Sequence, residues 1–405
     1  MNKKSKVKIG LLVSTLSSGG AERVVSRLTY ILSEEFDVTV IVFEKTDNMY
    51  TIDVPLIDMD IKTSNSIIVK VVHLVKRAIR LSKIKRELEL DVVISYLKGS
   101  NYVNILSKTA KCKVGISVRN YSLLEKYNSR LSQIQDLFSK LIYRKSDFII
   151  SVSDALSLSL IKNYNLNEKK VHRVYNPYDV NEIQQLGTEE IEPKYNDFFE
   201  GETLITVGRH EHQKGYWHLI KAFSIAKRKR PNLKLVMIGE GTATTKYIDL
   251  ISKLGLVNDV LLIKRCSNPY KYIAKSNLYI LTSIFEGFPN AMVEAMACGC
   301  PVVAADCKSG PREILYRTPN LEDVTEELEK ADFGLLTLAH SDIENFSEEI
   351  LEPSDFVLAK GIELLMSDKK LYANYSDSGR KRAFEFSYNV AKEKYKSIIE
   401  SYVSS

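Results

Sequence analysis

The sequence of 405 residues lacks any apolar run that approaches the ~20 residues needed to cross a membrane. It also lacks the features of a secretory signal peptide. The apolar stretch near its start is only Ile9–Val13, and no small-residue cleavage site follows. A first β-strand that enters a glycine turn explains this start better. No region is low in complexity. We therefore expect a folded chain that has neither a leader nor a membrane-spanning helix.

Cysteine is scarce, and its pattern excludes further classes of protein. Five cysteines, an odd number with no C-x-x-C pair, argue against a disulfide framework and for a reducing compartment, so we expect a cytoplasmic protein. Cys298 and Cys300 flank Gly299 at a predicted helix end, where small buried side chains are a better interpretation than metal ligands. The net charge of +6 is mild. It suits anionic ligands or an anionic membrane surface and does not indicate nucleic acid.

Strands and helices alternate along nearly the whole chain. Apolar runs without polar alternation, separated by helices, are typical of a parallel sheet covered on both faces. The rhythm pauses in the polar, linker-like stretch 176–201 and then restarts. The length and the restart predict two doubly wound, Rossmann-like α/β domains, at 1–180 and 203–386, with a final helix over 387–405. Two such domains would face each other across a ligand cleft at the carboxyl ends of their strands.

Basic residues follow the first strand of the second domain. The strand ends at Gly208, Arg209 follows it, and Lys214 and Gly215 precede a predicted helix. A guanidinium grips two oxygens at once and an ammonium adds a point charge, so the pair suits a diphosphate. Taken alone, the pattern also fits a solvated basic turn.

A short helix is predicted within the stretch EGFPNAMVEAMACGCPVV. Pro289 at its start and Gly299 just past its end set its limits at about 290–298. The backbone N–H groups of Phe288 and Asn290 point out of its N-terminus. They predict an anion site that suits a phosphate.

Two glutamates flank this helix start. Glu286 lies in the loop before the helix, and Glu294 lies one turn inside it. A carboxylate accepts hydrogen bonds from hydroxyls, and a vicinal diol offers two donors. One carboxylate can therefore hold a sugar and the other a ribose, with a diphosphate between them.

Candidate contact residues also follow two strands of the first domain. Gly19 and Gly20 permit close backbone approach to a phosphate or sugar at a helix start, although a Rossmann-like turn also uses such glycines structurally. Their spacing does not match the dinucleotide pattern G-x-G-x-x-G. Arg119 and Asn120, in ISVRNYS, should face the cleft. The alternative for Arg119 is a loop arginine paired with a surface acid.

Together these motifs resemble a known family. The chain is similar to the retaining nucleotide-sugar glycosyltransferases of family GT4, which have the GT-B fold. The resemblance rests on SGGAERV, VGRHEHQKG and the stretch with the two glutamates, which matches the family's E-x7-E signature. It covers nearly the whole chain. The segment CKSGPREIL resembles transferases of bacterial capsule and O-antigen assembly.

The resemblance implies a role for each matching residue. Arg209 and Lys214 would neutralise the donor diphosphate. Glu294 would hold the ribose hydroxyls, and Glu286 would contact the transferred sugar as a catalytic residue. Loop 265–270 would hold the base, and the two glycines after the first strand would approach the donor phosphates or the acceptor. The other expected contacts of the donor or acceptor are Gly19, Gly20, Arg265, Cys266, Phe288, Pro289 and Asn290.

One departure from the family concerns the first domain. Many members have a histidine close to the transferred sugar, whereas the equivalent loop here, ISVRNYS, has none. Arg119 or Asn120 would take its place in catalysis. The final helix, 387–405, would cross back to pack on the first domain.

The resemblance also implies the course of the reaction. The diphosphate would leave on the face that the acceptor hydroxyl approaches and would take its proton, which retains the anomeric configuration. The protein would supply position and positive charge, without a metal or cofactor. The expected donor is a UDP-linked hexose or N-acetylhexosamine. The expected acceptor is a saccharide on polyprenyl diphosphate in surface polysaccharide biosynthesis.

The segment Val69–Glu89 bears on the acceptor. Its apolar positions recur at intervals near three to four, with basic residues between them. Such a helix can lie on the anionic inner leaflet of a membrane, or it can pack its apolar face on a core. Both interpretations stay open. The basic residues are Lys76, Arg77, Arg80, Lys83, Lys85 and Arg86.

Three other functions compete with this hypothesis. A GT-A transferase would hold a metal ion through Asp58 and Asp60. A nucleotide-sugar epimerase would convert its substrate without an acceptor, and a non-catalytic GT-B subunit would bind glycans or scaffold a partner. The complete set of basic and acidic residues in the second domain favours the transferase.

Overall fold

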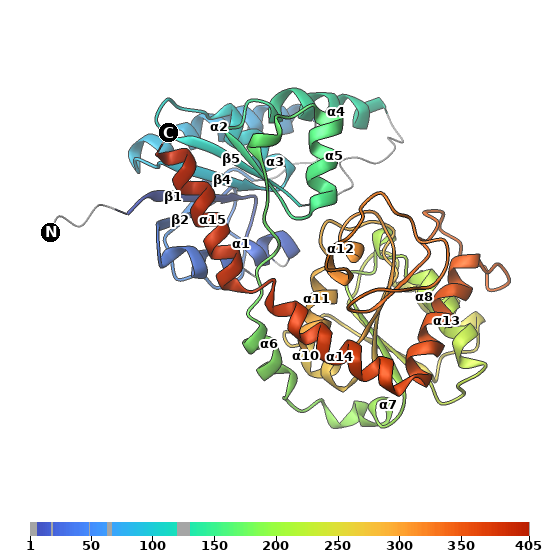
Figure 1. The fold of residues 1–405 in the computed structure, drawn as a ribbon. Coiled ribbons are helices and arrows are strands. Elements are labelled where there is room, and N and C mark those ends of the chain that lie inside the picture. Colours follow the sequence, from blue (N-terminus) through green and yellow to red (C-terminus); the bar gives the residue numbers. More distant parts are fainter. Residues whose placement is uncertain (1–5, 18, 48, 63–66, 120–129, 405) are drawn as a thin grey trace. The chain divides into compact units, whose positions relative to one another are not determined.

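The computed structural model describes residues 6–17, 19–47, 49–62, 67–119 and 130–404. The chain divides into two compact units: the first comprises Met1–Pro177 with Tyr388–Ser405, and the second comprises Tyr178–Ser387 (Figure 1). Each unit holds a seven-stranded sheet flanked by helices, which confirms the expected pair of doubly wound α/β domains. Among the described residues, none of the helices has the length and apolar character that a membrane crossing requires.

The first sheet has the strand order β3-β2-β1-β4-β5-β6-β7, and all neighbouring strands are parallel. The chain moves outward from β1 to β3 and then returns to place β4 beside β1. The strands are β1 (Lys8–Val13), β2 (Asp37–Val42), β3 (Leu56–Asp58), β4 (Val92–Tyr96), β5 (Lys113–Val118), β6 (Phe148–Ser151) and β7 (Val171–Arg173).

Helices cover both faces of the first sheet, because successive residues of a strand point to opposite sides. In β1, Leu11 belongs to the core formed with α1 and α15, whereas Leu12 belongs to the core formed with α2 and α3. Tyr395 and Ile399 of α15 are buried in this unit. Its helices are α1 (Gly20–Ser33), α2 (Ile67–Glu87), α3 (Lys98–Leu106), α4 (Arg130–Tyr143), α5 (Asp154–Tyr164), the 3-10 helix η2 (Glu168–Lys170) and α15 (Tyr388–Val403).

The second sheet has the order β10-β9-β8-β11-β12-β14-β13, and only the short β13 runs antiparallel to its neighbour. Its strands are β8 (Thr203–Val207), β9 (Lys234–Ile238), β10 (Val260–Ile263), β11 (Leu278–Leu281), β12 (Val302–Ala305), β13 (Glu329–Lys330) and β14 (Leu335–Thr337). Its helices are α6 (Val180–Gly187), η3 (Pro193–Tyr195), α7 (Asn196–Phe199), η4 (His212–Lys214), α8 (Tyr216–Lys227), α9 (Thr244–Lys253), α10 (Tyr270–Lys275), α11 (Asn290–Ala297), α12 (Pro311–Leu315), α13 (Pro353–Ser367) and α14 (Lys369–Phe384).

The polar stretch 176–201 is not a linker, and the prediction was wrong there. Most of it belongs to the second unit, where α6 packs against α10 and α11. Asp179 caps α6 by accepting a backbone N–H at 2.9 Å. Val180 and Ile183 form the buried face of the helix. A few well-spaced apolar residues therefore suffice to fold a stretch that is polar overall.

A buried lysine joins α2 to α3. Lys85, predicted on a basic face, is only 2% exposed. Its Nζ donates to the carbonyl and Oδ1 of Asn104 at 3.2 and 2.8 Å, and to the Ser107 carbonyl at 3.4 Å. Burial lowers the pKa of Lys85 to about 8. The ammonium is thus held by oxygens of α3.

Candidate active site

The loops that follow β8 and β11 are bonded to each other at the carboxyl edge of the second sheet. The side-chain amide of Gln213 donates to the Phe285 carbonyl at 3.0 Å, and the Gln213 carbonyl accepts the N–H of Ile284 at 2.8 Å. The Thr282 hydroxyl donates to the Lys214 carbonyl at 3.0 Å. These bonds bring the basic turn beside the first glutamate of the predicted pair.

Lys214 and Glu286 form an ion pair where the two loops meet. Lys214 Nζ lies 2.5 Å from Glu286 Oε1, and the Ser283 hydroxyl donates to the same oxygen at 2.7 Å. The side chains are only 19% and 8% exposed, so water screens the pair little. Two residues that were predicted to contact different parts of a donor contact each other in this structure.

Arg209 lies at the carboxyl end of β8, as predicted. Its side chain is exposed, and its guanidinium has no hydrogen bond or ion pair within the part of the chain that the structure describes. A guanidinium in this position offers its full fork of N–H donors to an external anion.

The helix α11 begins after Pro289 and ends before Cys298, within one residue of the predicted limits. Its N-cap residue, Pro289, makes no side-chain hydrogen bond to the first turn, and that turn contains no acidic residue. The backbone N–H groups at Asn290 and beyond are therefore suited to an anion. Phe288, in the loop before the helix, is buried.

Glu286 and Glu294 are both buried, with 6% and 3% of their surface exposed. Burial raises the pKa of Tyr279, and the charges of both glutamates act in the same direction. Both carboxylates therefore lie near the same buried residue of β11. The sugar and ribose contacts predicted for these two carboxylates stay predictions.

Two glycines permit the close approach of loops at this edge. Gly215 has φ +58°, and a Cβ there would lie 2.3 Å from the Thr282 carbonyl oxygen. Gly310 has φ +96°, and a Cβ there would lie 2.5 Å from the Pro289 ring. The segment CKSGPREIL thus packs directly against the start of α11, which the sequence did not predict.

The predicted base-binding residues follow β10. Arg265 is exposed and Cys266 is half-buried. Burial raises the pKa of Cys266, and the nearby charge of Glu192 acts in the same direction. No hydrogen bond or ion pair between described residues joins Arg265 or Cys266 to the ion pair formed by Lys214 and Glu286.

The glycine turn of the first unit lies at the start of α1. Gly19 is the N-cap and Gly20 is the first helical residue. A Cβ on Gly19 would lie 2.0 Å from a carboxylate oxygen of Glu22. This acidic side chain covers the helix N-terminus, where the helix dipole stabilises it. A phosphate at Gly19 would have to displace it.

Arg119 follows β5 and is tied into the interior of the first unit. Its guanidinium donates to Asn176 Oδ1 and lies 5.8 Å from the centre of the Tyr96 ring. Burial raises the pKa of Tyr395, and the charge of Arg119 and a hydrogen bond from it to Tyr395 partly oppose this rise. The alternative of a surface acid as its partner is therefore wrong. Asn120 lies outside the described residues.

Sequence reasoning missed two residues that hold the Glu286 carboxylate. Ser283 donates to one carboxylate oxygen at 2.7 Å, and the Gln213 amide lies 3.5 Å from the other. Ser283 follows the apolar strand β11, and Gln213 precedes Lys214 in the basic turn. Their closeness in sequence to predicted site residues is the signal that could have found them.

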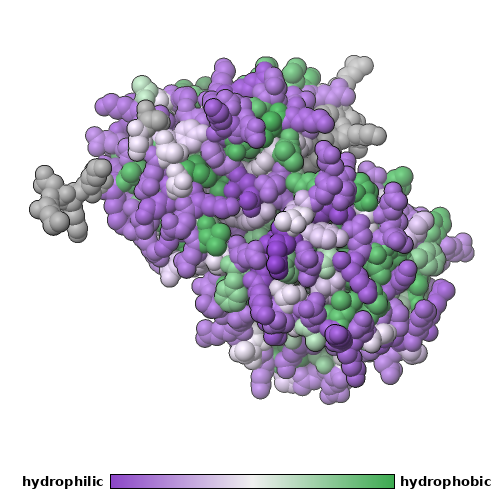
Figure 2. Space-filling view, viewed as in Figure 1, coloured by the Kyte–Doolittle hydropathy of each residue, from purple (hydrophilic) through white to green (hydrophobic). Residues whose placement is uncertain are grey.

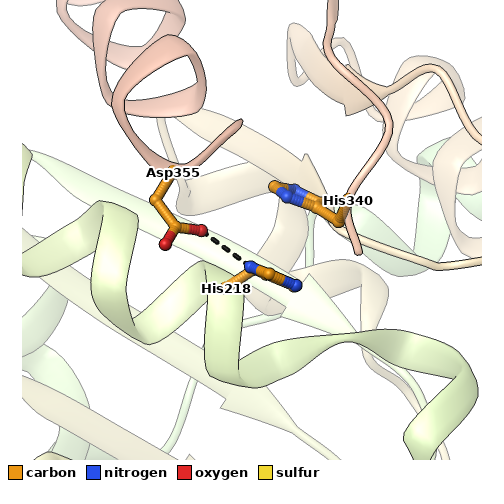
Figure 3. A group of neighbouring side chains, drawn as sticks. All are labelled: His218, His340 and Asp355. Atoms are coloured by element: carbon orange, nitrogen blue, oxygen red, sulfur yellow. Dashed lines mark hydrogen bonds and ion pairs between the residues drawn. The ribbon is translucent and has the colours of Figure 1, made fainter. Parts of the chain in front are cut away.

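Three buried side chains join α8, α13 and the segment after β14. Figure 3 shows the His218 ring between the Asp355 carboxylate and the His340 ring. His218 Nδ1 lies 2.7 Å from Asp355 Oδ1, and its Nε2 lies 3.1 Å from the Ser341 carbonyl oxygen. His218 is thus held through both ring nitrogens, by α13 on one side and by the segment after β14 on the other.

The His340 ring is stacked on His218, with centroids 4.3 Å apart and planes 12° apart. Neither nitrogen of His340 has a hydrogen-bond partner in the described chain. Possible ligand atoms of the three residues lie within 4.8 Å of one another. Imidazole lone pairs lie in the ring plane, however, so two stacked rings do not direct them at one ion. The geometry favours a buried hydrogen-bonded cluster that supports α8.

Two sheets of this topology, with a basic turn, two buried carboxylates and a helix N-terminus beside the second sheet, are those of a GT-B glycosyltransferase. The family model "Glycosyltransferase Family 4" matches residues 18–182, and "Glycosyl transferases group 1" matches residues 187–320. The chain therefore belongs to the family 4 glycosyltransferases with the GT-B fold.

Three relatives and one solved structure illustrate the similarity. An uncharacterised glycosyltransferase from Methanocaldococcus jannaschii is 32% identical over 81% of this chain and 83% of its own. An N-acetylgalactosaminyltransferase from Campylobacter jejuni, named for a diacetylbacillosaminyl-diphospho-undecaprenol acceptor, is 31% identical over 94% and 95%. The capsular polysaccharide glycosyltransferase CapM from Staphylococcus aureus is 28% identical over 63% and 62%. HepE from Anabaena, solved with UDP-glucose, has a TM-score of 0.72 at 18% identity, over 97% and 99%.

The GT-B fold rules out the GT-A hypothesis. In this structure Asp58 and Asp60, its expected metal ligands, form a turn instead. Asp58 ends β3 and accepts the backbone N–H groups of Asp60 at 2.8 Å and of Lys45 at 3.2 Å. These bonds shape a turn in which Asp60 has φ +52°.

Proposed function

We propose that the protein is a retaining hexosyltransferase that moves a sugar from a UDP-linked hexose or N-acetylhexosamine to a saccharide on polyprenyl diphosphate. The observation that carries this proposal is the Lys214–Glu286 contact of 2.5 Å beside the exposed Arg209. This contact supports the proposal, because a cation suited to a diphosphate lies next to a carboxylate that can accept hydrogen bonds from hydroxyls. The names of the Campylobacter relative and of HepE support the acceptor and the donor.

Donor binding would exchange the partners of this ion pair. Lys214 would turn to the diphosphate, and Glu286 would accept hydrogen bonds from hydroxyls of the transferred sugar. Arg209 and the N-terminus of α11 would stabilise the charge that develops on the leaving group. The leaving oxygen would take the acceptor proton, so neither a metal nor a protein nucleophile is needed. Glu294 would hold the ribose diol.

Surface polysaccharide assembly is the proposed setting, and the cytoplasmic membrane surface is the proposed place. α2 supports this because it has a second apolar stripe besides the one that faces the core. Val71, Val75 and Ile79 are 57%, 51% and 67% exposed at intervals of four residues. Exposed Lys76 and Arg80 lie among them. Figure 2 shows hydrophobic side chains scattered among hydrophilic ones on the visible face of the first unit. A basic helix of this kind suits an anionic bilayer.

The first test is a panel of UDP- and GDP-sugars, incubated with and without a synthetic polyprenyl-diphosphate saccharide. We expect nucleotide release from one UDP-sugar, faster with the acceptor and lost in Glu286→Ala. The anomeric configuration of the product reports retention. Conversion of the sugar without an acceptor would favour an epimerase. Nucleotide binding without transfer to any acceptor would favour a glycan-binding subunit.

The membrane partner is tested by sedimentation with vesicles that contain anionic lipid. The double variant Val75→Glu, Ile79→Glu should bind about tenfold more weakly, because it places charge in the apolar stripe. Val324→Glu is the matched control, since Val324 is a 72% exposed apolar residue of the second unit. Equal binding of all three proteins would contradict this part of the proposal.

A further inference from the structure

The chain passes between its two units at Pro177–Tyr178 and again at Ser387–Tyr388. On the side of the second unit, the two passing segments are joined. The Tyr178 N–H donates to the Phe386 carbonyl at 3.0 Å, and Tyr178 and Ser387 form an isolated parallel bridge. Tyr178 is fully buried, although it stands in a stretch that is polar by sequence.

Both passing segments contact the start of α11. The Tyr178 hydroxyl donates to Asn290 Oδ1 at 2.5 Å. The Phe386 ring packs edge-on against the Phe288 ring, with centroids 5.3 Å apart and planes 74° apart. The residues on either side of Pro289 are thus held from outside the loop. Because each contact is between buried or half-buried groups, both restrict how the helix start is oriented.

We propose that Tyr178 is a positioning residue for the nucleotide, which acts through Asn290 by fixing the direction of the N–H groups at the start of α11. This inference rests on the proposed function, because it takes the anion at that N-terminus to be the donor diphosphate. An anion site of this kind depends on the direction in which a few backbone N–H groups point. A small rotation of the first turn therefore weakens anion binding. The hydroxyl of Tyr178 itself does not need to touch the nucleotide.

The first measurement is the binding of UDP and of GDP, by calorimetry, to the full chain and to Tyr178→Phe. We expect the dissociation constant of the preferred nucleotide to rise about tenfold, since the variant removes the hydroxyl that donates to Asn290 Oδ1. The matched control is Tyr375→Phe. Tyr375 is a buried tyrosine of the same unit whose hydroxyl donates to the Ala331 carbonyl at 2.9 Å. It should lose a similar amount of thermal stability and keep the affinity of the original protein.

The second measurement asks whether the effect runs through Asn290. In a double-mutant cycle with Asn290→Ala, the substitution Tyr178→Phe should cause no further loss of affinity. An unchanged affinity in Tyr178→Phe, a loss as large in Tyr375→Phe, or a full additional loss in the Asn290→Ala background would each overturn the positioning role. If the original protein binds neither nucleotide, the proposed function fails together with this inference. If it binds one of them, only the role of Tyr178 is at stake.

Discussion

The two units share an architecture, but their polar side chains gather in different ways. In the second unit, buried charged groups converge where strands end: Lys214 contacts Glu286, and Glu294 lies near the same strand. In the first unit, Arg119 at the end of β5 bonds inward to Asn176, while apolar side chains of α2 lie on the surface. In the proposed function, the second unit would bind the charged nucleotide sugar, and the first unit would offer its surface to an amphiphilic acceptor.

The largest expected effect comes from breaking the ion pair of the second unit. Lys214→Met should lower kcat/KM by about 10²–10³, the usual loss for one preorganised group at a developing charge. It should also lower the melting temperature, because the buried Glu286 carboxylate loses its partner. The double variant Lys214→Met, Glu286→Gln is the control, and it should recover stability without activity. Recovery of both would show that the pair is only structural.

A smaller effect separates the two glutamates. Glu294→Gln should raise the dissociation constant of the nucleoside diphosphate about tenfold, because a carboxylate binds a diol more strongly than an amide does. Glu286→Gln should instead lower turnover and leave nucleotide affinity within about twofold, as this carboxylate faces the sugar in the proposed complex. Calorimetry with the diphosphate and steady-state kinetics measure the two effects. The opposite pattern would exchange the two roles.

A third prediction concerns pH and the His340 ring. Burial, and then the charge of His218, hold the pKa of His340 well below its usual 6.5. The unfolded chain therefore takes up a proton as pH falls below about 6.5, while the folded chain does not. Stability should be lost by at most about 1.4 kcal/mol per pH unit from this ring. Urea unfolding of the original protein and of His340→Phe, at pH 7.5 and 5.5, measures it. Equal slopes would contradict the prediction.

The smallest effect is expected for the turn after β3. Asp58→Asn should leave activity unchanged within about twofold, because this carboxylate accepts backbone N–H groups of its own turn and has no part in the proposed reaction; the amide oxygen keeps one of the two bonds. Activity in the presence of EDTA is the companion measurement. Loss of activity in both experiments would return a metal-dependent mechanism to consideration.

The sequence was informative where local chemistry decides the structure. The apolar strands and the limits of α11 followed from unbroken apolar runs and from Pro289 and Gly299. The contact between Lys214 and Glu286 was not predicted, because 72 residues separate them and only the pairing of β8 with β11 brings their loops together. The bond from Arg119 to Asn176 was not predicted for the same reason. These two residues are 57 positions apart.

The stretch 176–201 shows the opposite error. Its average polarity suggested a linker, but folding depends on which side of each turn the few apolar residues occupy, and Val180 and Ile183 share a side. The role of Tyr178 was hidden as well, since nothing in its neighbours distinguishes a buried tyrosine from a loop tyrosine. The sequence listed six basic residues between the apolar positions of α2. Most of them are exposed, but Lys85 is buried.

The buried Lys85 also allows chemical labelling to report on the packing of α2 against α3. The pKa of about 8 belongs to the packed state; when α2 and α3 separate, Lys85 regains the pKa of an ordinary, exposed lysine. Its burial keeps acylating reagents away for as long as α2 and α3 stay packed. The rate at which mass spectrometry detects acylation at this position would therefore report how often those two helices separate, and whether bound lipid vesicles slow or hasten that opening.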